Sequence, residues 1–222
     1  MKNLKKIINK IKKKNKENKK ICFFLGNTKK LENKSFFFTP VRENQECFFF
    51  GAIVYNDNIA KKILKNIDGL VDYIFVDVEK KVKSKNTNLE LINIERSAKD
   101  CIKKSILNVY KANDLTISSA ETLIGNLFLK DRRGVGGKKI LILGVGNIGF
   151  KLSLKLVESG ANVYLYRRNQ KILFDLTKTI NLIKPSGTKS KAINLKKFPN
   201  DLSKFNLIVT AVNKIDLIKL HQ

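Results

Sequence analysis

The sequence has few of the residues on which metal and nucleophile chemistry usually depend. It contains no tryptophan, a single histidine at His221, and three widely separated cysteines, Cys22, Cys47 and Cys101. Ser-His-Asp triads and histidine-based zinc sites need histidines that this chain lacks, so we expect neither a triad nor a metal site. Without a C-x-x-C pair, the cysteines are typical of small buried side chains in a reducing compartment. Catalysis must therefore depend on a cofactor, on lysines or on carboxylates.

Long apolar runs are also missing. A membrane-spanning helix needs about 18 or more consecutive apolar residues, and the longest candidates, at 140–144 and 206–212, have the length of strands. The apolar stretch 21–25 is too short for the core of a signal peptide. With 43% apolar residues, the chain can still bury a sizeable core. We therefore expect a soluble, cytoplasmic protein with no membrane partner.

Acidic residues are scarce relative to basic ones. The chain has 45 Lys and Arg against 19 Asp and Glu, a formal net charge of +26, which favours weak attraction to polyanions. Only six of the basic residues are arginines, the side chain preferred for bidentate phosphate recognition. The excess of Lys, Asn, Ile and Phe is what an AT-rich coding sequence produces. We therefore expect no specific nucleic-acid partner, with a basic nucleic-acid-binding protein as an alternative.

Residues 1–20 form a basic leader. Leu4, Ile7, Ile8 and Ile11 recur at helical spacing among lysines. A basic amphipathic helix can contact a membrane surface, but this one has no aromatic residue on its apolar face. We favour a frayed leader helix that lies on the following domain, or disorder beyond Lys12.

Strand-like and helix-like patterns alternate over 21–130, which predicts a small N-terminal α/β domain with a mostly parallel sheet. Strands are expected at 22–25, 47–54, 72–78 and 115–117, and helices at 58–67 and 97–110. A further helix from Ser118 is expected to bury Leu123, Ile124, Leu127 and Phe128. The charged, glycine-rich connector 130–137 then predicts a domain boundary, with the second domain at 131–222.

The connector is followed by the segment with the clearest chemical signal, K-K-I-L-I-L-G-V-G-N-I-G. Gly144, Gly146 and Gly149 follow an apolar strand at 140–143 and open a helix. The buried face of that helix is expected to contain Ile148, Leu152, Leu156 and Val157. Gly160 ends it, and a second strand at 162–166 follows, which is the βαβ context that a dinucleotide-binding fingerprint requires.

Each part of this turn has a physical role in holding a dinucleotide. The three glycines permit a tight turn, a close approach of a pyrophosphate, and close packing of helix on strand. The helix N-terminus, with Asn147 and Ile148, offers N–H groups and partial positive charge to phosphates. The turn therefore predicts dinucleotide binding; the alternative is a Rossmann-like domain that has lost its ligand.

The residues after the second strand indicate which dinucleotide binds. NAD enzymes usually place Asp or Glu there for the ribose 2′-hydroxyl, whereas this chain has Tyr166-Arg167-Arg168-Asn169. Arg167 and Arg168 suit a 2′-phosphate by charge and by stacking on adenine, so NADP is favoured over NAD; the alternative is two solvated arginines. Further strands are expected at 191–195 and 206–213, the latter beside the first strand. The residues expected to line the nicotinamide side are Ala211, Val212 and Asn213.

Together these segments resemble a known group. K-K-I-L-I-L-G-V-G-N-I-G, V-Y-L-Y-R-R-N and N-L-I-V-T-A-V-N are similar to the nucleotide-binding domain of shikimate dehydrogenase, glutamyl-tRNA reductase, and the methylene-tetrahydrofolate and methylene-tetrahydromethanopterin dehydrogenases, among the amino-acid-dehydrogenase-like Rossmann families. The resemblance covers roughly 118–217 and is only architectural before that. It implies a substrate domain, a long connecting helix, a doubly wound parallel sheet, and an NADP-linked dehydrogenase acting on a small metabolite bound between the domains.

Two departures from this group concern catalysis. Shikimate dehydrogenases carry a catalytic lysine in an N-V-T-x-P-x-K segment, and the nearest segment here has Lys81 in that place with different flanking residues. Lys81 is the catalytic candidate, able to polarise a carbonyl or relay a proton, or else a solvated charge. Asp77 and Glu79 are candidate ligands of a polar substrate or simply polar strand-end residues. The aspartate of the group's N-T-D segment is absent, with only Glu121 nearby, so shikimate is not expected as the substrate.

The chain stops about ten residues after the fourth expected strand, where the group continues with further strands and a closing helix. We therefore expect an incomplete Rossmann domain with exposed apolar surface that a partner or a homo-oligomer would cover. The expected function is an NADP-dependent oxidoreductase that transfers a hydride between nicotinamide and a small polar metabolite. A non-catalytic or degenerate dinucleotide-binding protein is the alternative.

Overall fold

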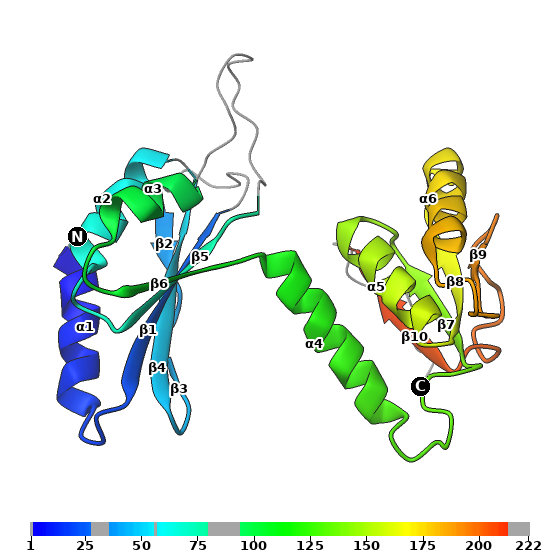
Figure 1. The fold of residues 1–222 in the computed structure, drawn as a ribbon, viewed down its shortest axis with the longest axis horizontal. Helices are drawn as coiled ribbons and strands as arrows, with labels where there is room; N and C mark the ends of the chain where they lie inside the picture. Colours follow the sequence, from blue (N-terminus) through cyan, green and yellow to red (C-terminus); the bar gives the residue numbers. More distant parts are fainter. Residues whose placement is uncertain (1, 28–35, 56, 80–93, 213–222) are drawn as a thin grey trace. The chain divides into compact units, whose positions relative to one another are not determined.

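The structure, a computed structural model, describes residues 2–27, 36–55, 57–79 and 94–212. They form two compact units, divided between Ala112 and Asn113, and each unit has its own hydrophobic core (Figure 1). Both units combine helices with a largely parallel sheet, so the predicted α/β class is confirmed. The division precedes the helix that the sequence had assigned to the first domain.

The first unit is a six-stranded sheet with helices packed on it. Its elements are α1 (Lys2–Lys14), β1 (Lys20–Asn27), β2 (Phe36–Phe38), β3 (Arg42–Glu43), β4 (Cys47–Val54), α2 (Asp57–Ile67), β5 (Tyr73–Asp77), α3 (Ile94–Cys101) and β6 (Ile106–Tyr110). The strand order is β2-β4-β1-β5-β6, with β3 also paired to β4. Strands β4, β1, β5 and β6 are parallel, whereas β2 and β3 run antiparallel to β4. Helices α1, α2 and α3 lie on one face of this sheet (Figure 1).

The basic leader belongs to this core. Leu4, Ile8 and Ile11 of α1 are buried in it, while lysines such as Lys5 and Lys6 are exposed. The apolar face of α1 therefore packs on the domain and is not available for a membrane surface. No helix within the described residues is long and apolar enough to cross a membrane.

The prediction of a single helix over 97–110 is wrong. Helix α3 ends at Cys101, and strand β6 begins at Ile106. The Asp68 carboxylate holds the intervening turn, since it accepts hydrogen bonds from the backbone N–H groups of Lys103 (2.9 Å), Lys104 (3.0 Å) and Ser105 (2.8 Å). Burial works against ionisation of this carboxyl, but the amide donors outweigh it and lower the pKa of Asp68.

The prediction of a strand at 115–117 and a helix start at Ser118 is also wrong. One helix, α4 (Ala112–Leu127), covers both segments. Its residues Ile117 and Ile124 are buried in the second core, which overrides the β propensity of a short Leu-Thr-Ile run. Leu123 and Leu127, expected to be buried, are 63% and 61% exposed.

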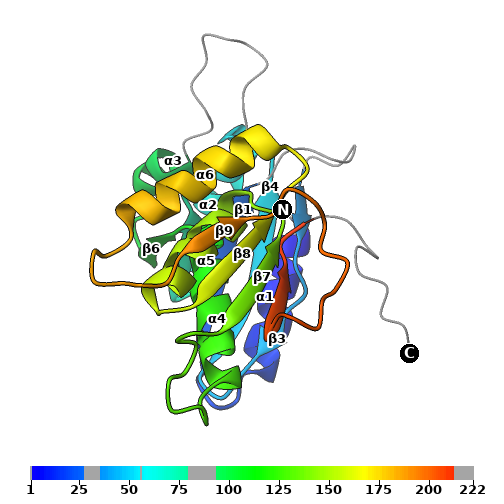
Figure 2. The same ribbon diagram turned by 90° about the vertical axis from the view of Figure 1, so that its right-hand side faces the viewer.

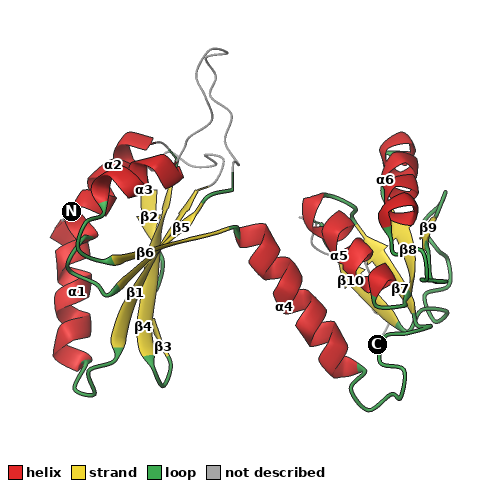
Figure 3. Cartoon of the chain, viewed as in Figure 1, coloured by secondary structure: helices red, strands yellow, loops and turns green. Residues whose placement is uncertain are grey.

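The second unit contains α4 and the βαβ segment predicted from the glycine turn. The elements after α4 are β7 (Lys139–Leu143), α5 (Asn147–Glu158), β8 (Asn162–Tyr166), α6 (Gln170–Ile183), β9 (Ala192–Asn194) and β10 (Leu207–Thr210). Figure 3 shows these helices in red and the strands in yellow. The four strands expected here from the sequence are confirmed.

The sheet of the second unit is parallel, with strand order β10-β7-β8-β9. Figure 2 shows β7, β8 and β9 next to one another beside α6. Helices α5 and α6 pack against each other and on the sheet. Phe198 and Phe205, from the segment between β9 and β10, make edge contacts with Tyr166 and Tyr164. Read from β9, the order is 3-2-1-4, which is the strand order of a Rossmann fold.

Candidate functional site

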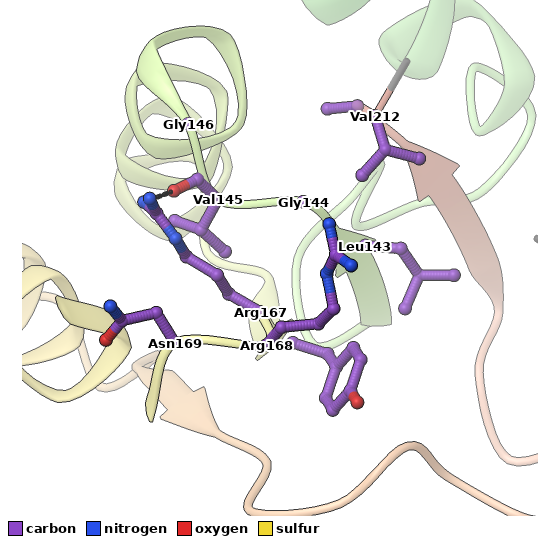
Figure 4. A pocket seen from close by; sticks show the side chains of 10 residues that line it. Leu143, Gly144, Val145, Gly146, Arg167, Arg168, Asn169 and Val212 are labelled. Carbon is purple, nitrogen blue, oxygen red and sulfur yellow. Dashed lines mark hydrogen bonds between the residues drawn. The ribbon is translucent and has the colours of Figure 1, made fainter. Parts of the chain in front are cut away.

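A pocket lies at the carboxyl ends of β7, β8 and β10, with a cavity volume of about 570 Å³ (Figure 4). Its lining residues are Leu143, Gly144, Val145, Gly146, Tyr166, Arg167, Arg168, Asn169, Ala211 and Val212. The chain leaves β7 toward β8 on one side, whereas β10 returns to its other side. Such a reversal of strand order is where open α/β sheets form a ligand crevice.

Two glycines of the turn are required by the protein itself. Gly144 has φ +95°, and a Cβ atom there would lie 2.7 Å from the carbonyl oxygen of Ala211. A Cβ at Gly149 would overlap the backbone oxygen of Gly144. These positions therefore give the tight turn and the close contact of helix and strand that the sequence predicted.

Gly146 differs, because the protein does not fill the space around it. It has an ordinary φ of −93°, and no atom lies within 4 Å of where its Cβ would be. Gly146 is also the N-cap residue of α5, and as a glycine it makes no side-chain capping hydrogen bond. Space and the positive end of the helix dipole thus coincide at the pocket, an arrangement that suits a phosphate group.

The two arginines after β8 both line the pocket, as expected from the sequence. The Nη1 of Arg167 donates a hydrogen bond to the backbone oxygen of Val145 at 2.7 Å (Figure 4). The Arg168 side chain extends across the pocket toward Gly144, and its guanidinium has no hydrogen-bond or ion-pair partner among the described residues. None of the described residues that line the pocket is a carboxylate. A positively charged pocket edge of this kind suits an anion such as a 2′-phosphate.

The other predicted cofactor residues lie at or beside the same pocket where the structure describes them. Ala211 and Val212 line it, and Asn147 and Ile148 form the first turn of α5. Asn213 lies outside the described residues.

The residues considered for catalysis or substrate binding are not among the described residues that line this pocket. Lys81 lies outside the described residues. Asp77 is buried and accepts hydrogen bonds from the backbone N–H groups of Glu79 (3.0 Å) and Ala112 (3.3 Å), as a strand-end residue does. Glu121 forms an ion pair with Lys155 at 2.6 Å and thereby joins α4 to α5. Within the described residues, no cluster of His, Cys, Asp or Glu could hold a metal ion.

Four lining residues were not predicted, namely Leu143, Val145, Tyr166 and Asn169. Val145 lies between two turn glycines, and Leu143 and Tyr166 are the last residues of their strands. Asn169 is the N-cap of α6, since its side chain accepts a hydrogen bond from the N–H of Ile172 at 3.1 Å. Strand ends and an Asn before a helix were the signals that could have found them.

Strand order, glycine turn and pocket position together define the second unit as a Rossmann-type fold. No family model matches the sequence, and no curated protein matches it. Solved structures do show similarity at the level of fold.

L-tryptophan dehydrogenase from Nostoc punctiforme is 11% identical, with a TM-score of 0.40, over 79% of this chain and 51% of that one. The A chain of dipicolinate synthase from Bacillus subtilis is 12% identical, with a TM-score of 0.33, over 86% and 72%. The PH0520 protein from Pyrococcus horikoshii OT3 is 17% identical, with a TM-score of 0.31, over 85% and 62%. This chain thus spans about half the length of the tryptophan dehydrogenase.

Proposed function

We propose that the second unit binds NADP and that the protein is an NADP-dependent oxidoreductase. The observation that carries this proposal is the space at Gly146, the N-cap residue of α5, beside a pocket edge with two arginines. A dinucleotide needs these features together, since its pyrophosphate and its 2′-phosphate are separate anionic groups.

Each part of the cofactor has a candidate partner in the pocket. The N–H groups at Gly146, Asn147 and Ile148 would hold the pyrophosphate, and the turn after β8, which carries Arg167 and Arg168, would provide the site of the 2′-phosphate. Ala211 and Val212 would border the nicotinamide, whose chemistry when bound is hydride transfer. That no carboxylate occurs among the described lining residues favours NADP over NAD, because a carboxylate there would repel the 2′-phosphate.

The substrate that we propose is a small polar metabolite with a carbonyl or hydroxyl group. Lys81 is the proposed proton donor or acceptor at that oxygen. Its place in the sequence supports this role, because it follows Asp77, the last residue of β5, by four positions. Polar residues after parallel strands meet at the carboxyl edge of a sheet, where substrates bind.

The experiment is a fluorescence titration of the full chain with NADPH and, in parallel, with NADH. We expect NADPH to bind at least about tenfold more tightly, as one charge-assisted contact to a phosphate supplies. A screen of small hydroxy and keto metabolites for NADPH turnover then follows. Binding without turnover of any substrate selects the non-catalytic alternative, and no binding of either nucleotide contradicts the proposal.

A further inference from the structure

Arg167 and Arg168 are neighbours in the sequence, but their side chains do different things. Arg167 is engaged within the protein, where its Nη1 lies 2.7 Å from the backbone oxygen of Val145. Arg168 points across the pocket, and its guanidinium is unpaired among the described residues (Figure 4). Arg167 therefore already has a hydrogen-bond partner in the protein, whereas the Arg168 guanidinium is available to a ligand.

The contact of Arg167 lies at a sensitive point of the pocket. Val145 is the residue between Gly144 and Gly146, and its side chain is fully buried. Glycine lies on both sides of Val145. The backbone of this turn therefore loses more conformational entropy when it becomes ordered than a turn without glycine would. A charge-assisted hydrogen bond to the Val145 carbonyl restricts that freedom and offsets the negative end of a carbonyl dipole beside the phosphate space.

The backbone of Arg167 is itself held in place. The side-chain Nε2 of Gln170 donates a hydrogen bond to the Arg167 backbone oxygen at 2.7 Å, in the turn that leads from β8 into α6. Through its hydrogen bond to Val145, Arg167 joins the end of β8 to the turn after β7. These are the two loops between which the pocket opens.

We propose that Arg167 is a positioning residue that holds the glycine turn in shape through Val145, whereas Arg168 alone supplies the charge for the 2′-phosphate. This assignment of separate roles rests on the proposed function. It predicts that loss of each arginine changes nucleotide binding in a different way. Loss of Arg168 removes the preference between nucleotides. Loss of Arg167 weakens a feature that NADPH and NADH share, the pyrophosphate turn, and leaves the preference intact.

The test compares Arg167→Met, Arg168→Met and Arg167→Lys in the full chain, by titration with NADPH and with NADH. For Arg168→Met we expect NADPH affinity to fall about tenfold or more and NADH affinity to stay unchanged. For Arg167→Met we expect both affinities to fall by the same factor, about fivefold, the usual effect of one hydrogen bond. Arg167→Lys keeps a charged donor and should recover part of the loss.

A second measurement does not depend on any nucleotide. Amide hydrogen exchange over 144–149 of the free protein should be faster in Arg167→Met than in the wild type and unchanged in Arg168→Met. A fall in the NADPH-to-NADH preference of Arg167→Met, or unchanged exchange in that variant, overturns the positioning role. If the wild type binds neither nucleotide, the proposed function fails, and the exchange data alone decide whether Arg167 holds the turn.

Discussion

The glycines of the turn have different structural roles, although they belong to one sequence motif. Gly144 and Gly149 are fixed by contacts that a side chain would break, whereas Gly146 faces open space. The spacing of the motif predicted these roles because they follow from backbone geometry. The different contacts of Arg167 and Arg168 could not be predicted, because the hydrogen bond to Val145 depends on how two separate loops approach each other in the fold.

A second residue, Tyr110, predicts how stability depends on pH. Burial, together with the negative charge of Asp77, raises the pKa of Tyr110 to about 12 from an ordinary value of 10.0. The folded state therefore favours the neutral phenol, so this contribution to stability is complete below pH 10 and is lost as the pH rises toward 12.

The matched variant for this prediction is Tyr110→Phe, which keeps the ring that meets Phe24 edge-on at 6.0 Å. Between pH 9 and 11.5, the free energy of unfolding of the wild type should fall by about 1 kcal/mol more than that of the variant, allowing for solvent screening of a partly exposed group. Urea unfolding followed by circular dichroism at the two pH values measures this. Parallel pH profiles would rule out the effect.

At the scale of elements, the local sequence pattern was sufficient to predict helices and strands where glycines mark the turns between them. The unit β7-α5-β8 was predicted almost to the residue, because glycines mark both ends of α5 and the apolar period is unambiguous. The segment 97–110 was misread because its apolar residues fit a helix throughout. What divides it is Asp68, a carboxylate from a distant part of the sequence that holds the turn at Lys103–Ser105.

Helix α1 contributes to the stability of the first unit through its apolar face. Ile8 is buried against the sheet of the first unit, while Lys6 on the same helix is exposed. Ile8→Ala should lower the free energy of unfolding by about 3 kcal/mol through lost burial and a cavity. Lys6→Ala, the control, should change it by less than about 0.5 kcal/mol. Equal, small effects in urea titrations would mean that α1 is a frayed leader and not part of the core.

At the scale of the whole molecule, the most pronounced feature of the composition is a formal net charge of +26. It is carried mostly by lysines, many on exposed faces such as that of α1. Composition could therefore suggest attraction to polyanions but could not distinguish a partner from a general charge excess. The α/β class, in contrast, followed from the alternation of strand and helix patterns along the chain.

The charge predicts binding to oligonucleotides that is weak and independent of sequence. Its affinity should fall at least about tenfold between about 50 and 200 mM salt, because counterion release drives it. NADPH binding should decline less steeply, since the pocket also supplies backbone N–H groups. Fluorescence anisotropy with two unrelated oligonucleotides, over a salt series, measures this. Binding that resists salt and prefers one sequence would favour the nucleic-acid-binding alternative.

The most direct test of the central claim, that the α5 N-terminus with Gly146 holds a dinucleotide phosphate, is an NADPH titration of Gly146→Ala beside Gly187→Ala. Neither glycine has an atom within 4 Å of where a Cβ would be, so both variants should fold as the wild type does. We predict that Gly146→Ala loses at least about tenfold in NADPH affinity, because the methyl group fills the phosphate space, while Gly187→Ala binds normally. Unchanged NADPH binding by a folded Gly146→Ala would contradict the account.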